Sequence, residues 1–213
     1  MIIDLHVHTD RYSKCSSLSP DLAVRNAKSQ GLDGICFMEH NAMWDRKDTE
    51  ELSRGYDFLI FRGMEVATDM GHILVFGIDQ YNKKMKSIKA LRSVVQAVNG
   101  TMIAAHPFRR PLYPNRGYGD WELTISPDVG AKREIFNMVD GLEVFNGKSS
   151  LVESMISLKI GKDLRLKNVA GSDAHSPSEV GKSATFFDID IHNEDDFLKA
   201  LKNCYCCGVN FRE

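Results

Sequence analysis

The chain has 213 residues, of which 43% are hydrophobic and 26% charged, and its formal net charge at pH 7 is −2. This composition is typical of a globular protein, so we expect a single domain over residues 1–213 without a general attraction for nucleic acid. No apolar run approaches the roughly 20 residues that span a bilayer, and no secretory signal opens the chain, so we expect a cytoplasmic protein that makes no membrane contact.

Short apolar runs, which predict strands, alternate with amphipathic segments, which predict helices. The apolar runs are residues 2–5, 34–38, 58–61, 73–76, 102–105, 141–145, 168–170 and 184–187. The amphipathic segments are residues 20–30, 87–98, 151–160 and 194–201. The first helix carries its own boundary signals, since Ser19 and Pro20 suit a helix start and Gly31 suits the residue after a helix end. This alternation predicts an α/β fold with a mainly parallel sheet, either open or closed into a barrel.

Residues 107–129 lack this periodicity and contain four prolines and two glycines. Irregular segments of this length are usually functional loops or disordered. We favour a loop that flanks the functional site and shapes its pocket. The five cysteines include no C-x-x-C pair, so we expect reduced thiols.

Histidines and acids gather at the edges of the predicted strands. His6 and His8 end the first strand with i, i+2 spacing, which places both side chains on one face. His192, in contrast, lies in a polar stretch and should be solvated. The other polar residues at strand edges are Glu39, His40, Glu65, His72, His106, Asp173 and His175. Because ligands gather at the carboxyl edges of strands in parallel α/β folds, these side chains should converge.

Imidazoles and carboxylates together suit zinc, iron(II) or manganese. Apart from Glu39, these residues are eight candidate ligands, which exceed what one ion requires, and carboxylates can bridge ions. The sequence therefore predicts two or three divalent transition-metal ions, whose identity stays open.

The chain resembles the PHP (polymerase and histidinol phosphatase) family of metal-dependent phosphoesterases in a set of short motifs and in the order of these motifs along the sequence. The motifs are Asp4-Leu5-His6-Val7-His8-Thr9, Glu39-His40-Asn41, Gly63-Met64-Glu65, Gly71-His72-Ile73-Leu74, His106-Pro107 and Ser172-Asp173-Ala174-His175. The resemblance implies a distorted (β/α)7 TIM-like barrel with a trinuclear metal site at the carboxyl ends of its strands.

The resemblance also implies which residues hold each ion. Glu65 would bridge the first and second positions. The first position would use His6, His8, Glu65 and Asp173, the second Glu65, His72 and His106, and the third His40 and His175 with a further acid or histidine.

Two positions depart from the family pattern. The loop after the first strand has Cys15 but no acid where one is usual, apart from the earlier Asp10, so Cys15 is a candidate ligand and the third ion could be weak or absent. Glu39 stands where the family commonly has aspartate, and we expect it to orient an imidazole.

A water held between two cations loses its proton near neutral pH, and the resulting hydroxide can attack phosphorus while the cations neutralise phosphoryl charge. We expect Glu65, Asp173 and His175 to take part most directly in catalysis. Cationic side chains that could bind the phosphate are Arg109, Arg110 and Lys148. The predicted function is therefore hydrolysis of a small phosphomonoester or phosphodiester.

Three alternatives stay open at this point. A metal-dependent hydrolase of the amidohydrolase type could use similar ligands for a C–N or ester bond. A PHP-type nuclease would act on nucleic acid, which the acidic balance of charge disfavours. A regulatory protein with a degenerate site is the third, and the missing acid near Cys15 is the feature that points to it.

Overall fold

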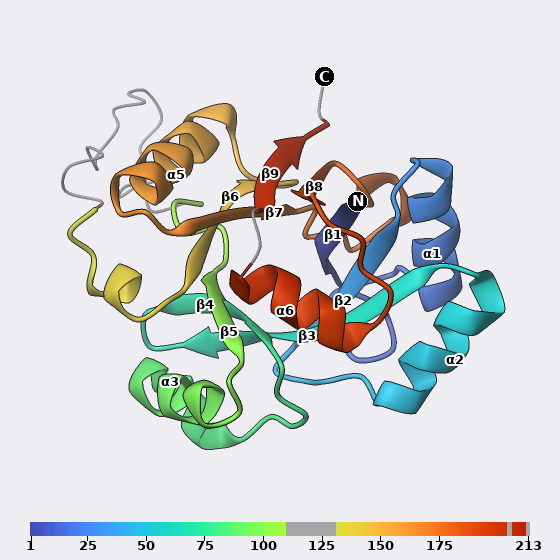
Figure 1. The fold of residues 1–213 in the computed structure, drawn as a ribbon, viewed down its shortest axis with the longest axis horizontal. Coiled ribbons are helices and arrows are strands. Elements are labelled where there is room, and N and C mark those ends of the chain that lie inside the picture. The colour runs from blue at the N-terminus through green and yellow to red at the C-terminus, as the bar shows by residue number, and fades with distance from the viewer. Residues whose placement is uncertain (110–130, 204–205, 212–213) are drawn as a thin grey trace.

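The computed structural model describes residues 1–109, 131–203 and 206–211. Within these residues, nine strands form one sheet in the order β7-β6-β5-β4-β3-β2-β1-β8-β9 (Figure 1). The strands are β1 (Ile2–Val7), β2 (Gly34–His40), β3 (Leu59–Thr68), β4 (Gly71–Phe76), β5 (Thr101–Ala104), β6 (Gly141–Asn146), β7 (Lys167–Gly171), β8 (Ser183–Phe187) and β9 (Cys206–Asn210). The eight predicted strands are all present.

Helices surround this sheet. The helices are α1 (Pro20–Ser29), α2 (Arg46–Tyr56), α3 (Ile88–Ala97), α5 (Leu151–Asp163) and α6 (Glu194–Asn203), with short 3-10 helices η1 (Lys83–Lys86), η2 (Glu134–Asn137) and η3 (Pro177–Glu179). Helix α1 has the predicted boundaries, because the Ser19 hydroxyl accepts from the backbone N–H of Leu22 and Gly31 follows with φ +75°. No helix among the described residues is long and apolar enough to cross a membrane.

The sheet is mixed rather than mainly parallel. Strands β1, β2 and β3 pair in parallel, as do β5, β6 and β7. Strand β4 is antiparallel to both β3 and β5, and β8 is antiparallel to both β1 and β9. The β3–β4 connection explains part of this difference, since only two residues separate Thr68 from Gly71 and such a short connection forms a hairpin.

The β7 end of the sheet curls back onto β1, which nearly closes a barrel. A parallel bridge joins Val7 to Ala174, and the backbone N–H of His8 donates to the carbonyl of Ala174 over 2.9 Å. Glycine allows this approach, because a Cβ on Gly171 would lie 2.4 Å from Cβ of His6. The chain therefore has the expected distorted TIM-like barrel, with departures from strict β/α alternation.

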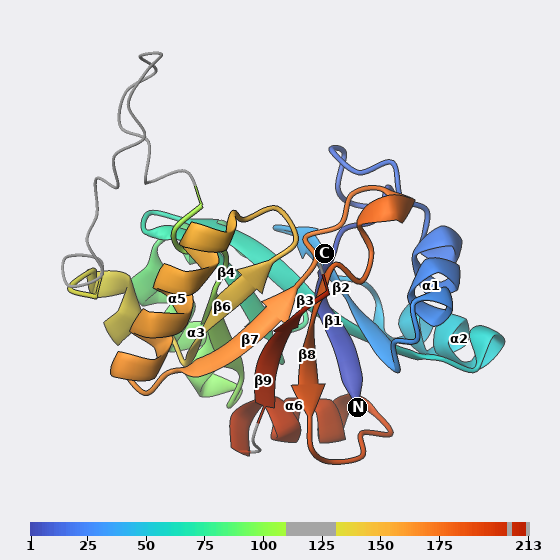
Figure 2. The same ribbon diagram turned by 90° about the horizontal axis from the view of Figure 1, so that it is seen from above.

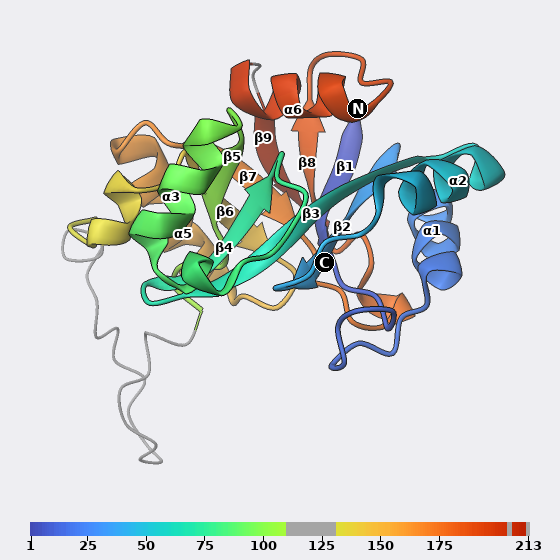
Figure 3. The ribbon, with the colours of Figure 1, turned by 90° about the horizontal axis from the view of Figure 1, so that it is seen from below.

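Helix α6 lies across the end of the barrel at which β1 begins (Figures 2 and 3). Its Phe197 and Leu201 belong to a buried cluster that also contains Leu5, Phe61 and Phe76. This cluster draws its members from β1 to β5 and β7 to β9, so it fills the barrel interior. The opposite end, where the parallel strands finish, is left for polar side chains.

Two elements, α2 and β9, lie outside the predicted set. Helix α2 buries only Thr49, so it lacks the apolar periodicity that predicts a helix, and it begins instead at a side-chain cap by Asp45. Strand β3 also runs further than its apolar run, so Glu65 lies inside this strand rather than after it.

Candidate metal centre

The predicted polar residues converge at the end of the barrel where the parallel strands finish. His6 belongs to β1, His40 ends β2, and Glu65 lies in β3. The remaining members come from the segments that start or follow neighbouring strands, namely His8, His72, His106, Asp173 and His175. Three groups of candidate ligands can be defined, and within each group the ligand atoms lie within 4.8 Å of one another. The first group is His6, His8 and Asp173, the second is Glu65, His72 and His106, and the third is His8, His40 and His175.

An irregularity in β1 turns its histidines toward this site. The β1–β2 register shifts between Asp4 and Val7, which marks a bulge. Leu5 packs in the barrel interior, whereas Val7 packs in a different cluster with α1. Because a bulge changes the face to which later side chains point, Leu5 and His6 can both face inward.

Four ligand atoms converge at the first group. Nε2 of His6 lies 3.0 Å from Nε2 of His8. Oε2 of Glu65 lies 3.6 and 3.4 Å from these two nitrogens, and Oδ1 of Asp173 lies 3.7 and 3.4 Å from them. Two imidazole nitrogens and two carboxylate oxygens around one point form a donor set that suits zinc, manganese or iron.

Glu65 connects this group to the second. Its Oε1 lies 2.8 Å from Nδ1 of His72 and 3.1 Å from Nε2 of His106. Its Oε2 is buried and receives no well-directed hydrogen bond from the described residues, although Nδ1 of His40 lies 2.8 Å away. A buried carboxylate oxygen without a hydrogen bond, surrounded by imidazoles, fits a metal-binding role.

The pKa values of the buried ionisable groups depend on one another. Burial raises the pKa of Glu65, but the charge of His6 and the close rings of His106 and His40 outweigh burial and hold this pKa well below its usual range. Burial lowers the pKa of His6, yet the carboxylates of Glu143, Asp173 and Glu65 raise it well above its usual range. Protons on histidine therefore balance the buried acids, and a divalent cation could take their place, because metal binding displaces protons from its ligands. The residues present thus fit metal ions at the first and second groups.

Hydrogen bonds to non-ligand residues orient the first two histidines. Nδ1 of His6 lies 2.8 Å from Oε1 of Glu143, and Nδ1 of His8 lies 3.2 Å from the hydroxyl of Ser13. Each contact occupies one ring nitrogen and leaves Nε2 facing the other ligand atoms. Ser13 and Asn146, whose amide donates to Glu143 over 3.0 Å, are contributors that no motif signalled.

Glu39 acts through a hydroxyl and not on an imidazole directly. Its carboxylate accepts hydrogen bonds from the Thr9 backbone and hydroxyl, the Ser13 hydroxyl and Nε1 of Trp44. Ser13 in turn contacts His8, so Glu39 reaches the imidazole of His8 through the Ser13 hydroxyl rather than by direct contact. The sequence could not show this because Ser13 lies 26 residues from Glu39.

Cys15 does not join the groups of candidate ligands. Its side chain is exposed, and it belongs to none of the three groups of candidate ligands. Burial, although incomplete, raises the pKa of this thiol in the metal-free protein. The structure therefore supplies neither an acid nor a thiolate of this loop to the third group.

Two of the predicted phosphate-binding cations lie at the cluster. A guanidinium nitrogen of Arg109 donates to Asp173, and another lies 3.1 Å from Nε2 of His106. Nζ of Lys148 lies 2.9 Å from Nδ1 of His175. The third, Arg110, lies outside the described residues, as does most of the predicted flanking loop.

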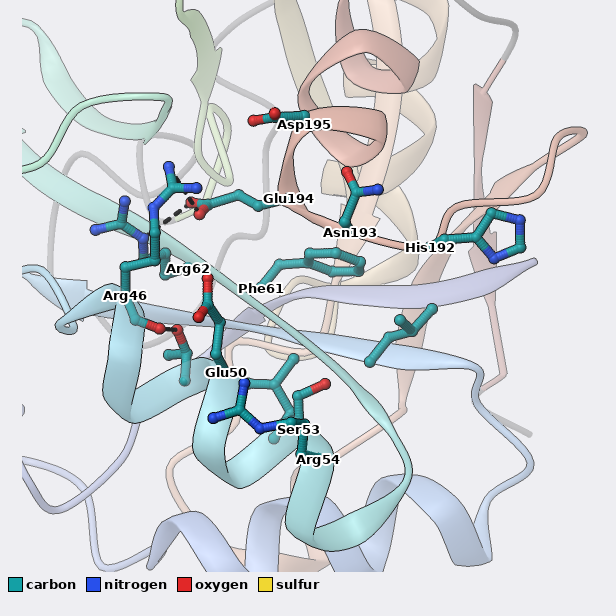
Figure 4. A pocket seen from close by; sticks show the side chains of 13 residues that line it. Arg46, Glu50, Ser53, Arg54, Phe61, Arg62, His192, Asn193, Glu194 and Asp195 are labelled. Atoms are coloured by element: carbon teal, nitrogen blue, oxygen red, sulfur yellow. Dashed lines mark hydrogen bonds and ion pairs between the residues drawn. The ribbon is translucent and has the colours of Figure 1, made fainter.

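A separate cavity of about 300 Å³ lies at the start of β3 and contains none of these residues (Figure 4). Three of its charged side chains form ion pairs, since Glu194 contacts Arg62 over 2.9 Å and Arg46 over 3.1 Å. Arg62 is buried and also pairs with Asp79. These ion pairs join α6 to α2 and β3, so we assign these side chains a structural role rather than a role in binding a ligand. His192 lines this cavity and is exposed, as expected.

Comparison with known proteins agrees with this geometry. The family model for the PHP domain matches residues 4–161, and the model for a PHP-associated family matches residues 156–204. The uncharacterized protein MJ1587 of Methanocaldococcus jannaschii is 24% identical over 180 residues, which cover 78% of this chain and 95% of that protein.

Solved structures share the fold at low sequence identity. A proposed metal-dependent phosphoesterase of Bifidobacterium adolescentis has a TM-score of 0.66 and 17% identity, over 93% of this chain and 95% of the other. PsfC of Pseudomonas syringae has a TM-score of 0.66 and 18% identity, over 98% and 91%. An amidohydrolase of Chromobacterium violaceum, solved with sulfate and no metal, has a TM-score of 0.63 and 16% identity, over 84% and 89%. Because the PHP domain model spans most of the chain and its motif residues converge in space, this protein belongs to the PHP domain family.

Proposed function

We propose that this protein is a metal-dependent phosphoesterase that hydrolyses a small phosphomonoester or phosphodiester. The observation that carries the proposal is the convergence of His6, His8, Glu65 and Asp173, with cationic side chains beside them. Acids and imidazoles suit divalent cations, and cations at the margin suit a phosphoryl group.

The geometry supports two ion positions in this proposal. His6, His8, Glu65 and Asp173 would hold the first ion, and Glu65 would share the second with His72 and His106. Zinc, manganese and iron all suit this donor set. When bound, such ions lower the pKa of water and neutralise charge that develops on phosphoryl oxygens.

The protein's own residues would hold the ligands and orient the substrate. Glu143 and Ser13 fix the rings of His6 and His8, so these ligands need little reorganisation. Arg109 pairs with Asp173 and approaches His106, both of which would bind metal. Ions at those positions would compete with this guanidinium, and its displacement would free it to bind a phosphoryl oxygen.

A cavity beside the second ion position supports a small substrate. It has a volume of about 240 Å³, and its lining includes His72, His106 and Arg109 together with apolar Met70 and Ile135. This volume lies just below the usual range for small-molecule sites, which is roughly 300–1,000 Å³. The substrate that we propose is therefore a small phosphorylated molecule.

Turnover of matched substrates tests this proposal. Protein stripped of metal would be reloaded with manganese, iron(II) or zinc, and assayed with p-nitrophenyl phosphate, bis(p-nitrophenyl) phosphate and p-nitroacetanilide. We expect metal-dependent release of p-nitrophenol from at least one phosphoester and no release of p-nitroaniline from the amide. Hydrolysis of the amide alone would support the amidohydrolase alternative, which the similarity of fold makes the second candidate. Single-stranded DNA would be assayed in parallel, and its degradation without turnover of the other substrates would support the nuclease.

A further inference from the structure

The third group of candidate ligands has too few free donors for an ion of its own. It consists of His8, His40 and His175. The carboxylate oxygens beside it, Oε2 of Glu65 at 2.8 Å from His40 and Oδ1 of Asp173 at 3.6 Å from His175, are those that face His6 and His8 in the first group. Nε2 of His8 faces His6, Glu65 and Asp173, while its Nδ1 faces Ser13.

An ion at the first position would therefore use His8, which leaves His40 and His175 for the third. Two imidazoles are fewer than the three protein ligands of typical catalytic zinc sites. Nδ1 of His40 is moreover 2.8 Å from Oε2 of Glu65, an atom that belongs to the first group. The residues present thus fit two ions better than three.

A cationic side chain already stands at the third group. Nζ of Lys148 lies 2.9 Å from Nδ1 of His175. Nδ1 of His175 also lies 2.9 Å from the backbone oxygen of Asp173, so this ring nitrogen has a close neighbour on two sides. An ammonium group this close to His175 repels a divalent cation that would bind there.

The backbone places Lys148 at this point. Its N–H donates to the side-chain oxygen of Asn146 over 2.9 Å, and the N–H of Gly147 donates to the carbonyl of Gly171 over 3.1 Å. A Cβ on Gly147 would lie 2.1 Å from the carbonyl oxygen of Ser172, so only glycine permits this approach. The end of β6 is thereby fixed against the segment that carries Asp173 and His175.

We propose that the centre holds two metal ions and that the ammonium group of Lys148 takes the place of a third. Lysine binds phosphate as a point charge, and charge on the phosphoryl oxygens must be neutralised on every side. Arg109 and Lys148 approach different residues of the cluster, His106 and His175, so they would contact the phosphoryl group from different sides. The ion count stands without the proposed function, whereas the phosphate contact rests on it.

Metal counting and phosphate binding together test this inference. The variants are Lys148→Met, which removes the charge at similar length, Lys148→Arg, which keeps it, and Lys89→Met, a control at an exposed lysine of α3. Bound manganese would be counted by elemental analysis after excess metal is removed. The affinity of the manganese-loaded proteins for inorganic phosphate would be measured by calorimetry.

We expect two ions per chain in the wild-type protein and in all three variants. Loss of one charge-assisted hydrogen bond should weaken phosphate binding about 10- to 100-fold in Lys148→Met, with most of the affinity kept in Lys148→Arg and all of it in Lys89→Met. Three ions in the wild-type protein would overturn the inference, and so would equal phosphate affinity in Lys148→Met. Neither readout needs turnover, so the ion count can be decided even for a protein that hydrolyses no phosphoester.

Discussion

Nδ1 of His6 lies 2.8 Å from Oε1 of Glu143, and both side chains are buried. The other oxygen of Glu143 accepts from the backbone N–H of His106 over 2.8 Å and from the amide of Asn146 over 3.0 Å. One carboxylate therefore fixes a ring of the first group of candidate ligands and the backbone of the second. This contact joins residues 137 positions apart.

Replacing Glu143 by glutamine should weaken metal binding without removing a ligand. Loss of the charged partner of a ligating histidine typically lowers metal affinity about 10- to 100-fold. Calorimetric titration with manganese measures the effect, and Glu134→Gln, at an exposed position of η2, is the matched control. Equal affinities in the two variants would show that Glu143 does not support the centre.

His8→Ala and Asp173→Asn should each abolish metal-dependent turnover. Both residues follow the ends of strands rather than filling the barrel interior, so the fold should be largely retained. Activity with added manganese and the far-UV circular dichroism spectrum provide the two readouts. Full activity in both variants would refute the assignment of the metal centre.

Removal of metal should lower the melting temperature as well as the activity. A ligand that binds only the folded state stabilises it by about 2.7 kcal/mol when its concentration is 100 times the Kd. We expect manganese to raise the melting temperature of the chelator-treated wild-type protein and to have much less effect on His8→Ala. A shift of the same size in both would indicate binding elsewhere.

Gly171→Ala should strain the closure of the barrel. The added Cβ would lie 2.4 Å from Cβ of His6 and 2.8 Å from its backbone nitrogen, so β7 and β1 would have to separate. Overpacking of this kind costs about 1–3 kcal/mol, and displacement of His6 should weaken metal binding too. Urea denaturation measures the first effect and manganese titration the second.

Gly55→Ala is the matched control for that substitution. Gly55 lies in α2, and nothing lies within 4 Å of a Cβ built there. Alanine in a helix should stabilise the protein by up to about 1 kcal/mol and leave metal binding unchanged. If both glycine variants behaved alike, close packing at Gly171 would not be the cause.

The stability of the metal-free protein should depend on pH through His175. Burial and the charge of His8 lower the pKa of His175 to about 4. Between pH 4 and 6.5 the unfolded chain therefore binds a proton here that the folded chain does not, so this contribution is present above pH 6.5 and lost as pH falls toward 4. At 1.36 kcal/mol per unit the loss is at most about 3 kcal/mol, and solvent screening of this half-buried ring reduces it.

Comparison with His175→Gln isolates this contribution. Glutamine does not titrate, so the difference in unfolding free energy between wild-type protein and variant should fall as pH decreases from 6.5 to 4. Urea denaturation at several pH values, with chelator present, gives that difference. A constant difference over this range would contradict the prediction.

Local sequence determined much of the fold and the chemistry of the centre. The i, i+2 spacing of His6 and His8 predicts a shared face, and their Nε2 atoms lie 3.0 Å apart. Ser19 and Gly31 mark the ends of α1 through backbone geometry that neighbouring residues set. Such features depend on contacts within a few residues, so a pattern in the chain can show them.

Tertiary structure decided what links distant residues. The hairpin of β3 and β4, the bulge before Val7 and the packing of Gly171 on His6 depend on how strands pair. The contacts of Ser13 with Glu39 and of Lys148 with His175 join side chains 26 and 27 residues apart. Composition and periodicity do not encode these distances, because they arise only when the sheet curls and brings separate strand ends together.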